Sequence, residues 1–535
     1  MIRAIRTQVF WFVVALCILF AVLRGPWLWG LAVTVPLLAL GIWDLFQTRH
    51  NLLRNYPLVG HLRYLIEGTG AEMRQYVVES NTEGMPFNRD QRSLIYQRAK
   101  NVTDKKPFGT ECDVYDEGYG LLAHTMAPKP LDPDPVANFR VDVGAPGTPH
   151  PYSCSVYNIS AMSFGSLSGP AIEALNRGAR AGRFAHITGE GSISRYHREG
   201  DGDLIWQIGT GYFGCRADDG TFDPEQFRQR AEREQVKMIE LKISQGAKPG
   251  HGGILPGSKV TEEIADARGI PVGKTCVSPA YHTAFDTPTG LLQFIARLRE
   301  LSGGKPVGFK LCIGRPHEFY AICKAILETG ILPDFITVDG AEGGTGAAPI
   351  EFSDHLGLPL REALLFVRNA LVGLDIDKEV RIAAAGKRVS AFDIAQALAL
   401  GADWCNTARG FMMAIGCIQA QACHTNECPV GVATQNPRMA RAIHVPSKAE
   451  RVHHFHRNTL EALAEVTAAA GLSHPREFHP RLIYERTSPT EVRSLASIFD
   501  FYAPGQLRDG RACTRMQPYW DAARPDTFAS SQEWI

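Results

Sequence analysis

The chain has no excess of charge of either sign. Its 535 residues include 56 basic and 56 acidic side chains, and no basic tract is interleaved with aromatic residues. Nothing in the charge therefore draws the protein to nucleic acid. Cysteines are few, 12 in all, and they lack the regular spacing of a small disulfide-bonded domain. This usage is typical of free thiols in a reducing compartment and indicates the cytoplasm for the bulk of the chain.

No small-residue cleavage site follows the apolar N-terminal stretch, which argues against a signal peptide. Uncharged apolar segments at 7–23 and 27–43 instead predict a two-helix membrane anchor over residues 1–50. Each segment is slightly shorter than the roughly 20 residues that an untilted membrane helix needs.

Basic residues flank this anchor on both sides. Arg3 and Arg6 precede the first segment, and Arg49 and Arg54 follow the second. By the positive-inside rule, both ends of the hairpin lie in the cytoplasm. We therefore expect a protein of the cell inner membrane whose catalytic domain is cytoplasmic.

The rest of the chain divides by composition. Residues 51–150 are polar and dotted with proline near their end, which predicts a connecting region that wraps onto a larger domain at 151–480. Residues 481–535 form a C-terminal extension. From residue 156 onward, short β-rich runs alternate with amphipathic helical stretches, as in a parallel sheet with crossover helices. The clear strands are expected at 156–160, 184–188, 238–244, 306–312, 334–339, 380–385 and 404–407, and the doubtful ones at 204–208 and 275–278.

This number of strands is close to eight, which favours an α/β fold in the form of a closed (β/α)8 (TIM) barrel over an open doubly wound sheet. Glycines such as Gly340 and Gly386 follow the expected strands, at the carboxyl end where barrel active sites form. No G-x-G-x-x-G opens a helix after the first strand, so a nicotinamide-binding Rossmann domain is not expected.

Cations stand at several expected strand ends. Lys387 and Arg388 follow the expected strand 380–385, and Arg409 follows the last expected strand, 404–407; barrels commonly hold phosphate after their last two strands. Lys310 lies in an otherwise apolar strand, where an unpaired ammonium would be costly. It could hold negative charge at the N1/O2 edge of a reduced flavin, or form a salt bridge with a strand carboxylate such as Asp339.

The tract KISQGAKPGHGG is too rich in glycine for a core. Its Lys242, Gln245 and Lys248 offer two cations and an amide within seven positions, which suits a dicarboxylate substrate lying over a flavin. Three more polar candidates at strand ends are Ser160, Ser163 and Glu190. Taken singly, residues of these types more often cap a helix or lie in a turn.

Cys417, Cys423 and Cys428 form a C-x5-C-x4-C run, and Pro429 follows directly. Three thiolates close together indicate a metal. Structural zinc, with His424 as a further ligand, usually shows paired C-x2-4-C hooks, which this run lacks. Thiolate-only ligation suits iron and sulfur better, and a three-iron cluster or a four-iron cluster with an outside ligand could be built.

The segments SAMSFGSLS, KISQGAKPG, DGAEGGTGAAP and CHTNECPVGVATQ, in this order, resemble the FMN-binding synthase domain of glutamate synthase. They resemble more closely its stand-alone relatives with an N-terminal membrane segment, and the match runs over about 160–435. The resemblance implies an FMN-binding barrel, a [3Fe-4S] cluster on the three cysteines, and a 2-oxoglutarate or 2-iminoglutarate pocket around the catalytic candidates Lys242, Gln245, Lys248 and Glu190. The cofactor-binding residues then expected are Ser160, Ser163, Lys310, Asp339, Gly343, Gly344, Thr345, Gly346, Gly386, Arg409 and Gly410.

Two departures concern the substrate. Full glutamate synthases begin with a glutaminase domain, whereas a membrane hairpin is expected here, so we expect no glutamine hydrolysis by this chain. His251 stands where glutamine-dependent members tend to have Glu, and TGEGS replaces GEGG. The substrate therefore stays open.

The leading hypothesis is a membrane-anchored FMN and [3Fe-4S] oxidoreductase acting on the CH–NH2 group of an amino acid, in either direction. Its partners would be a glutamate-like small molecule and an electron-carrying protein or quinone, and a homo-oligomer is left open. One alternative is an FMN-dependent 2-hydroxyacid dehydrogenase-like enzyme that uses His282 and Arg315 and passes electrons to quinone. The other is a non-catalytic redox scaffold in a membrane complex.

Overall fold

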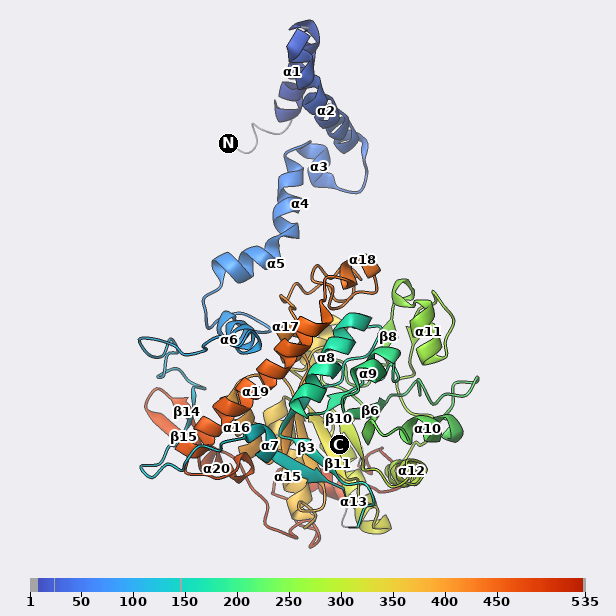
Figure 1. The fold of residues 1–535 in the computed structure, drawn as a ribbon, viewed down its shortest axis with the longest axis vertical. Helices are drawn as coiled ribbons and strands as arrows, with labels where there is room; N and C mark the ends of the chain where they lie inside the picture. Colours follow the sequence, from blue (N-terminus) through green and yellow to red (C-terminus); the bar gives the residue numbers. More distant parts are fainter. Residues whose placement is uncertain (1–7, 24, 145–146, 533–535) are drawn as a thin grey trace. The chain divides into compact units, whose positions relative to one another are not determined.

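The computed structural model describes residues 8–23, 25–144 and 147–532. It divides the chain into two compact units, one ending at Arg89 and one beginning at Asp90 (Figure 1). Arg3 and Arg6, on which part of the expected membrane orientation rests, lie outside the described residues, as do the last three residues of the C-terminal extension.

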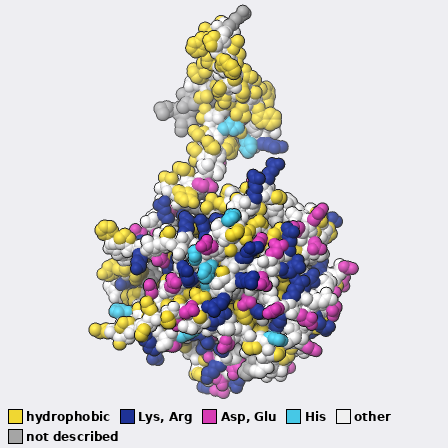
Figure 2. All heavy atoms as spheres, in the orientation of Figure 1, with side chains coloured by type: hydrophobic (Ala, Val, Ile, Leu, Met, Phe, Trp, Pro, Cys, Tyr) yellow, Lys and Arg dark blue, Asp and Glu magenta, His cyan; other side chains and the backbone are white. Residues whose placement is uncertain are grey.

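The first unit is helical. Within the described residues, one helix, spanning 25–46, is long and apolar enough to cross a membrane, and the preceding apolar helix is shorter at 16 residues. Large apolar side chains on both are exposed, including Trp11 at 62% and Trp29 at 82% (Figure 2). Its elements are α1 (Gln8–Leu23), η2 (Gly25–Gly30), α2 (Leu31–Phe46), α3 (Asn51–Asn55), α4 (Gly60–Gly68), α5 (Gly70–Met73) and the π-helix η3 (Arg74–Val78).

Helices α1 and α2 pack closely because a glycine faces an aromatic ring. A Cβ on Gly41 would lie 2.5 Å from Cδ2 of Phe10, so only glycine permits this approach. The polar end of α2 is fixed by Asp44, which is fully buried, accepts a hydrogen bond from the backbone N–H of Leu58 at 2.9 Å, and lies 2.8 Å from Nε2 of His61. A buried carboxylate needs such partners.

The second unit is built around a closed barrel of eight parallel strands, which confirms the expected fold. The strands, in barrel order, are β4 (Tyr157–Ile159), β5 (His186–Ile187), β6 (Leu204–Ile208), β7 (Val236–Lys242), β10 (Val307–Leu311), β11 (Phe335–Asp339), β12 (Arg381–Ala385) and β13 (Trp404–Thr407). Each of the seven clear expected strands is among them. The barrel interior and its surroundings bury Trp206, Tyr157 and Phe309 completely.

The two doubtful strands have different outcomes. Residues 204–208 form the third barrel strand. Residues 275–278 contain only β9 (Cys276–Val277), which pairs antiparallel with β8 (Ile254–Leu255) outside the barrel. Val277 is 64% exposed and Ile254 is 43% exposed, so this hairpin lacks the two-sided burial of a barrel strand. The hairpin belongs to a long excursion between β7 and β10, over residues 243–287.

Helices surround the strands (Figure 1). Several begin at a side-chain cap; Ser168, for example, accepts a hydrogen bond from the backbone N–H of Ala171. The helices of this unit are α6 (Arg89–Ala99), α7 (Pro135–Asn138), α8 (Gly169–Gly182), α9 (Arg195–Gly200), α10 (Pro224–Ala231), η4 (Gly257–Lys259), α11 (Glu262–Arg268), α12 (Pro288–Leu301), α13 (Pro316–Thr329), α14 (Ile350–His355), α15 (Leu360–Gly373), α16 (Ala391–Ala399), α17 (Arg409–Ala414), α18 (Pro437–Ala440), α19 (Val445–Ala469), η5 (Pro475–Glu477), α20 (Leu495–Ile498) and α21 (Gln517–Ala522). The remaining strands are β1 (Gly120–Leu122), β2 (Arg140–Val143), β3 (Tyr152–Ser155), β14 (Ile483–Ser488) and β15 (Glu491–Ser494).

Candidate active site at the carboxyl ends of the barrel strands

The ends of β5 and β7 bring together an acid and three cations. Lys242, the last residue of β7, places Nζ 3.0 Å from Oε2 of Glu190, which follows β5. Burial alone would raise the pKa of Glu190, but the charges of Lys242, Arg268 and Lys248 hold it below its usual range. Glu190 is therefore a carboxylate. We call Glu190, Lys242, Lys248 and Arg268 the cationic cluster.

Lys248 lies in the loop after β7 and is only 5% exposed. Burial lowers the pKa of its ammonium group, while the charge of Glu190 raises it. The loop is pressed against the next strands: a Cβ on Gly246 would lie 1.8 Å from the carbonyl oxygen of Gly340, and the N–H of Gly246 donates to Asp339 at 3.2 Å. Gln245 is half-buried in this loop. Three of the four predicted catalytic residues thus belong to one cluster, and Gln245 is its neighbour in sequence.

The lysine of β10 is paired inside the barrel. Nζ of Lys310 lies 3.1 Å from Oδ2 of Asp339, at the end of β11. Burial opposes the charge on Lys310, but Asp339 and Glu240 raise its pKa, so it stays protonated. This is the salt bridge given as the structural alternative. Glu240 itself is fully buried and accepts hydrogen bonds from Thr337 and Gln207 at 2.6 and 2.5 Å.

A second group of cations follows β12 and β13. Arg409 donates to the carbonyl oxygen of Glu342 at 3.0 Å, and Arg388 lies 4.0 Å from the Glu342 carboxylate. Burial lowers the pKa of Lys387, and the neighbouring Arg409 lowers it further. Three cations therefore crowd around one carboxylate at the strand ends where barrels hold phosphate. We call Lys387, Arg388 and Arg409 the basic strand-end group.

Glycines make room around Arg409. A Cβ on Gly344 would lie 2.7 Å from Cζ of Arg409, and Gly410 continues α17 next to Thr407. Gly386 has φ +151° directly after β12, a backbone conformation that residues with a side chain rarely adopt. The predicted tract of Gly343, Gly344, Thr345 and Gly346 is half-buried at its start and exposed afterwards.

The first strand contributes the two predicted serines. Ser160 is 7% exposed and its N–H donates to the carbonyl oxygen of Thr407 at 3.0 Å, which places it beside the end of β13. The hydroxyl groups of Ser163 and Ser166 lie 2.9 Å apart. A Cβ on Gly189 would come within 2.5 Å of the Ser163 N–H, so this loop packs against the residue before Glu190.

Cys417, Cys423 and Cys428 line one small cavity together with Met412, Pro429 and Val432. Burial, together with the charges of the other two cysteines, raises the pKa of Cys417 to about 11. Among the described residues, no three His, Cys, Asp or Glu side chains are placed to hold a single metal ion. Three thiols around an apolar cavity fit a polynuclear iron–sulfur group better than a mononuclear zinc ion.

Arg409 lies between the barrel mouth and this thiol cavity. Burial lowers the pKa of its guanidinium group, and the charges of Asp339, Glu342 and Cys417 raise it. The guanidinium group of Arg409 therefore interacts electrostatically with both Asp339, the partner of Lys310, and Cys417.

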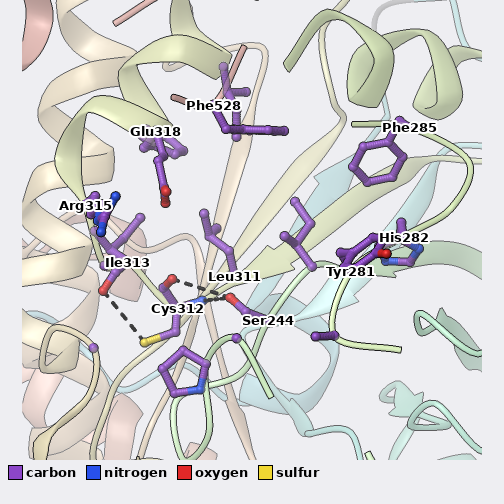
Figure 3. A pocket seen from close by; sticks show the side chains of 18 of the residues that line it. Ser244, Tyr281, His282, Phe285, Leu311, Cys312, Ile313, Arg315, Glu318 and Phe528 are labelled. Atoms are coloured by element: carbon purple, nitrogen blue, oxygen red, sulfur yellow. Dashed lines mark hydrogen bonds between the residues drawn. The ribbon is translucent and has the colours of Figure 1, made fainter. Parts of the chain in front are cut away.

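A cavity of about 960 Å³ lies at the carboxyl ends of β7 and β10 (Figure 3). Both candidates for hydroxyacid chemistry, His282 and Arg315, line it. Nδ1 of His282 lies 3.1 Å from the Tyr212 hydroxyl, Nε2 lies 2.8 Å from the carbonyl oxygen of Lys242, and burial lowers the pKa of the ring to about 4. Both ring nitrogens are occupied, which leaves His282 badly placed as a general base.

Sequence reasoning missed several residues of the site. Arg268 and Glu240 belong to it. Two other residues contact the backbone of the cysteine loop. Lys259 Nζ donates to the carbonyl oxygen of Cys423 at 2.8 Å, and the Tyr96 hydroxyl donates to the carbonyl oxygen of Cys417 at 2.8 Å. Glu240 carried a signal, because a carboxylate in the apolar run MIELK needs a buried partner. The other three reach the site only through the fold.

Fold and site together define a (β/α)8-barrel protein with lysine and arginine side chains at its mouth and an adjacent thiol site. The conserved region of glutamate synthase matches residues 131–473, and the chain belongs to this family. A glutamate synthase large subunit-like protein of Bacillus subtilis is 38% identical over 490 residues, covering 84% of this chain and 93% of that protein. An archaeal-type glutamate synthase [NADPH] of Thermotoga neapolitana is 35% identical over 315 residues, which span 59% of each chain.

Solved structures with a similar outline include a flavocytochrome b2 mutant with pyruvate bound. It is 11% identical, covers 84% of this chain and 96% of its own, and has a TM-score of 0.41. With this TM-score and identity, the comparison supports no conclusion beyond the barrel topology.

Proposed function

We propose that this protein is a membrane-anchored oxidoreductase that acts on the CH–NH2 group of an amino acid, with FMN in the barrel mouth and a [3Fe-4S] cluster on the three cysteines. The observation that carries the proposal is the meeting of three sites at one end of the barrel. These are the cationic cluster, the basic strand-end group and the thiol-lined cavity. Membership of the glutamate synthase family supports the reaction class.

The charge of the cationic cluster favours a dicarboxylate. Lys242, Lys248 and Arg268 face a single carboxylate, that of Glu190, which leaves an excess of two positive charges in a buried place. Because unpaired buried charge is costly, a ligand with two negative charges completes the site. The molecules 2-oxoglutarate, 2-iminoglutarate and glutamate meet this requirement. Glu190 is placed to orient the ammonium group of Lys242 or to take a proton from the substrate nitrogen.

The basic strand-end group suits the phosphate of FMN, and the Lys310–Asp339 pair lies at the strand ends between the two cationic sites. When bound, FMN supplies two-electron exchange with the carbon that carries the nitrogen, and the cluster supplies one-electron exchange with an outside carrier. Lys310 is already neutralised by Asp339, so its contribution at the flavin would be a fixed N–H donor rather than a free positive charge. Arg409, near both Asp339 and Cys417, would separate the two cofactors.

A panel of substrates tests the reaction class. The purified full chain is mixed anaerobically with glutamate, other amino acids, or 2-hydroxyacids such as lactate, and the flavin absorbance is followed. We expect bleaching by glutamate-like amino acids. Bleaching by hydroxyacids alone would favour the hydroxyacid dehydrogenase alternative, and no response to any small substrate would favour a redox scaffold.

The first unit supports membrane attachment, with both ends of the hairpin on the cytoplasmic side of the cell inner membrane. An apolar helix of 22 residues and exposed tryptophans favour a bilayer, and Arg49 and Arg54 follow it. In that position the main domain could exchange electrons with a quinone or a membrane-bound protein. Alkaline carbonate extraction of membranes checks the attachment: the chain should stay in the pellet, and its release as a soluble protein would contradict it.

A further inference from the structure

A buried lysine from the excursion after β7 reaches the cysteine loop. Lys259, the last residue of η4, is 3% exposed. Its Nζ donates to the carbonyl oxygen of Cys423 at 2.8 Å and to that of Ala433 at 3.2 Å. One ammonium group therefore connects the middle of the cysteine loop to the segment that follows Cys428.

The backbone around Lys259 is held in place. A Cβ on Gly257 would lie 2.4 Å from the carbonyl oxygen of Gly273, and the N–H of Gly257 donates to the Thr275 hydroxyl at 3.1 Å. The short helix that ends at Lys259 is thus held at its first residue, Gly257, and Lys259 is a buried side chain. The same excursion begins with the loop that carries Lys248, so it joins the cationic cluster to the cysteine loop.

Lys259 is a buried ammonium group beside the cysteine loop. Its two hydrogen-bond acceptors are neutral carbonyl groups, those of Cys423 and Ala433. Because a buried cation is retained only where negative charge or good acceptors compensate it, this position is most favourable beside a negatively charged iron–sulfur group.

We propose that Lys259 is a positioning residue for the iron–sulfur site, whose ammonium group fixes the cysteine loop and favours the reduced form of the cluster. The inference rests on the cluster of the proposed function. Reduction adds one negative charge to the cluster, and a fixed positive charge nearby stabilises the more negative state. Neighbouring charges and hydrogen bonds are among the factors that set the potentials of such clusters. The reduction potential is therefore higher with Lys259 present than without it.

The experiment compares three variants of the full-length holoprotein by a redox titration followed by EPR, together with iron and sulfide analysis. Lys259→Gln keeps a hydrogen-bond donor but removes the charge, and Lys259→Arg keeps the charge. The matched control is Lys305→Gln, because Lys305 is also buried and donates to two backbone carbonyls, those of Ala231 and Arg233, on a different part of the barrel.

We expect Lys259→Gln to lower the reduction potential, with the oxidised-to-reduced ratio at a fixed potential changing about tenfold, or 59 mV for a one-electron couple. Lys259→Arg and Lys305→Gln should keep the wild-type potential. An unchanged potential in Lys259→Gln, or an equal shift in Lys305→Gln, would overturn the proposal. If Lys259→Gln loses its iron, retention of iron by Lys259→Arg supports the role of the charge, and loss of iron from both contradicts it. A wild-type protein without iron would instead refute the cluster itself.

Discussion

Replacing Lys248 with methionine separates substrate binding from folding. Lys248 is 5% exposed, and burial holds its pKa below the ordinary value. Methionine fills a similar volume without an ammonium group to desolvate. Folding should therefore be unchanged or slightly more favourable, whereas a substrate carboxylate loses a charged partner.

The expected magnitude follows from the chemistry of that contact. A hydrogen bond to a charged group is worth about 1.5–3 kcal/mol, which corresponds to roughly a 10- to 150-fold loss of kcat/KM for a dicarboxylate. The assay is steady-state turnover with glutamate or with 2-oxoglutarate and ammonium, with bound flavin measured by absorbance. Lys274→Met, at an exposed lysine of the same excursion, is the control and should keep wild-type kinetics.

The pH dependence of Lys248 has a definite sign. Its pKa is lower in the folded than in the unfolded chain, so between these two values the unfolded chain binds more protons. The contribution of Lys248 to stability is complete above the unfolded pKa and is lost as pH falls through the folded pKa. In denaturant titrations at several pH values, Lys248→Met should reduce the rise of the unfolding free energy with pH. Unchanged kcat/KM in a folded, flavin-bound Lys248→Met protein would refute the assignment of Lys248 to the substrate.

Three further predictions concern the architecture of the site. Gly246→Ala should lower kcat/KM at least tenfold and destabilise the fold by about 1–3 kcal/mol, because the new Cβ would lie 1.8 Å from the carbonyl oxygen of Gly340. The control is Gly314→Ala, whose Cβ would meet open space; it should change neither kcat/KM nor the free energy of unfolding. Lys310→Met should cost about 3–5 kcal/mol in urea unfolding, since it leaves a buried carboxylate unpaired, and a smaller loss would show that water reaches the pair. Cys428→Ser should lose iron in metal analysis whereas Cys405→Ser, on a buried barrel strand, should retain it, and equal iron in both would contradict the ligand assignment.

Much of the fold could be predicted from local sequence. The alternation of β-rich and helical runs determines the barrel, and each of the seven clear strands is present because its apolar run is buried on both faces. The segment 275–278 was harder to assign because Cys276 and Val277 have strand propensity but lie in an exposed hairpin. A short apolar run does not by itself show which sheet it joins.

The site was predictable where one segment carries the chemistry. Lys242, Lys248 and the three cysteines belong to compact motifs, and the structure places them as two groups. Partners from distant segments were not predictable. Arg268 and Lys259 lie on the excursion between β7 and β10, and only the folded chain brings them to Glu190 and Cys423. The pairing of a lysine on β10 with a carboxylate on β11 was one of two alternatives for Lys310, raised by the rule that buried charges need partners.

The central claim is that the barrel mouth and the cysteine loop hold two redox cofactors that exchange electrons. The most direct test is a visible and EPR spectrum of the purified, full-length protein, recorded anaerobically before and after the addition of glutamate. The account predicts flavin absorbance together with a three-iron EPR signal, and loss of both the flavin bands and that signal after glutamate is added. A colourless protein with one zinc ion per chain would contradict it.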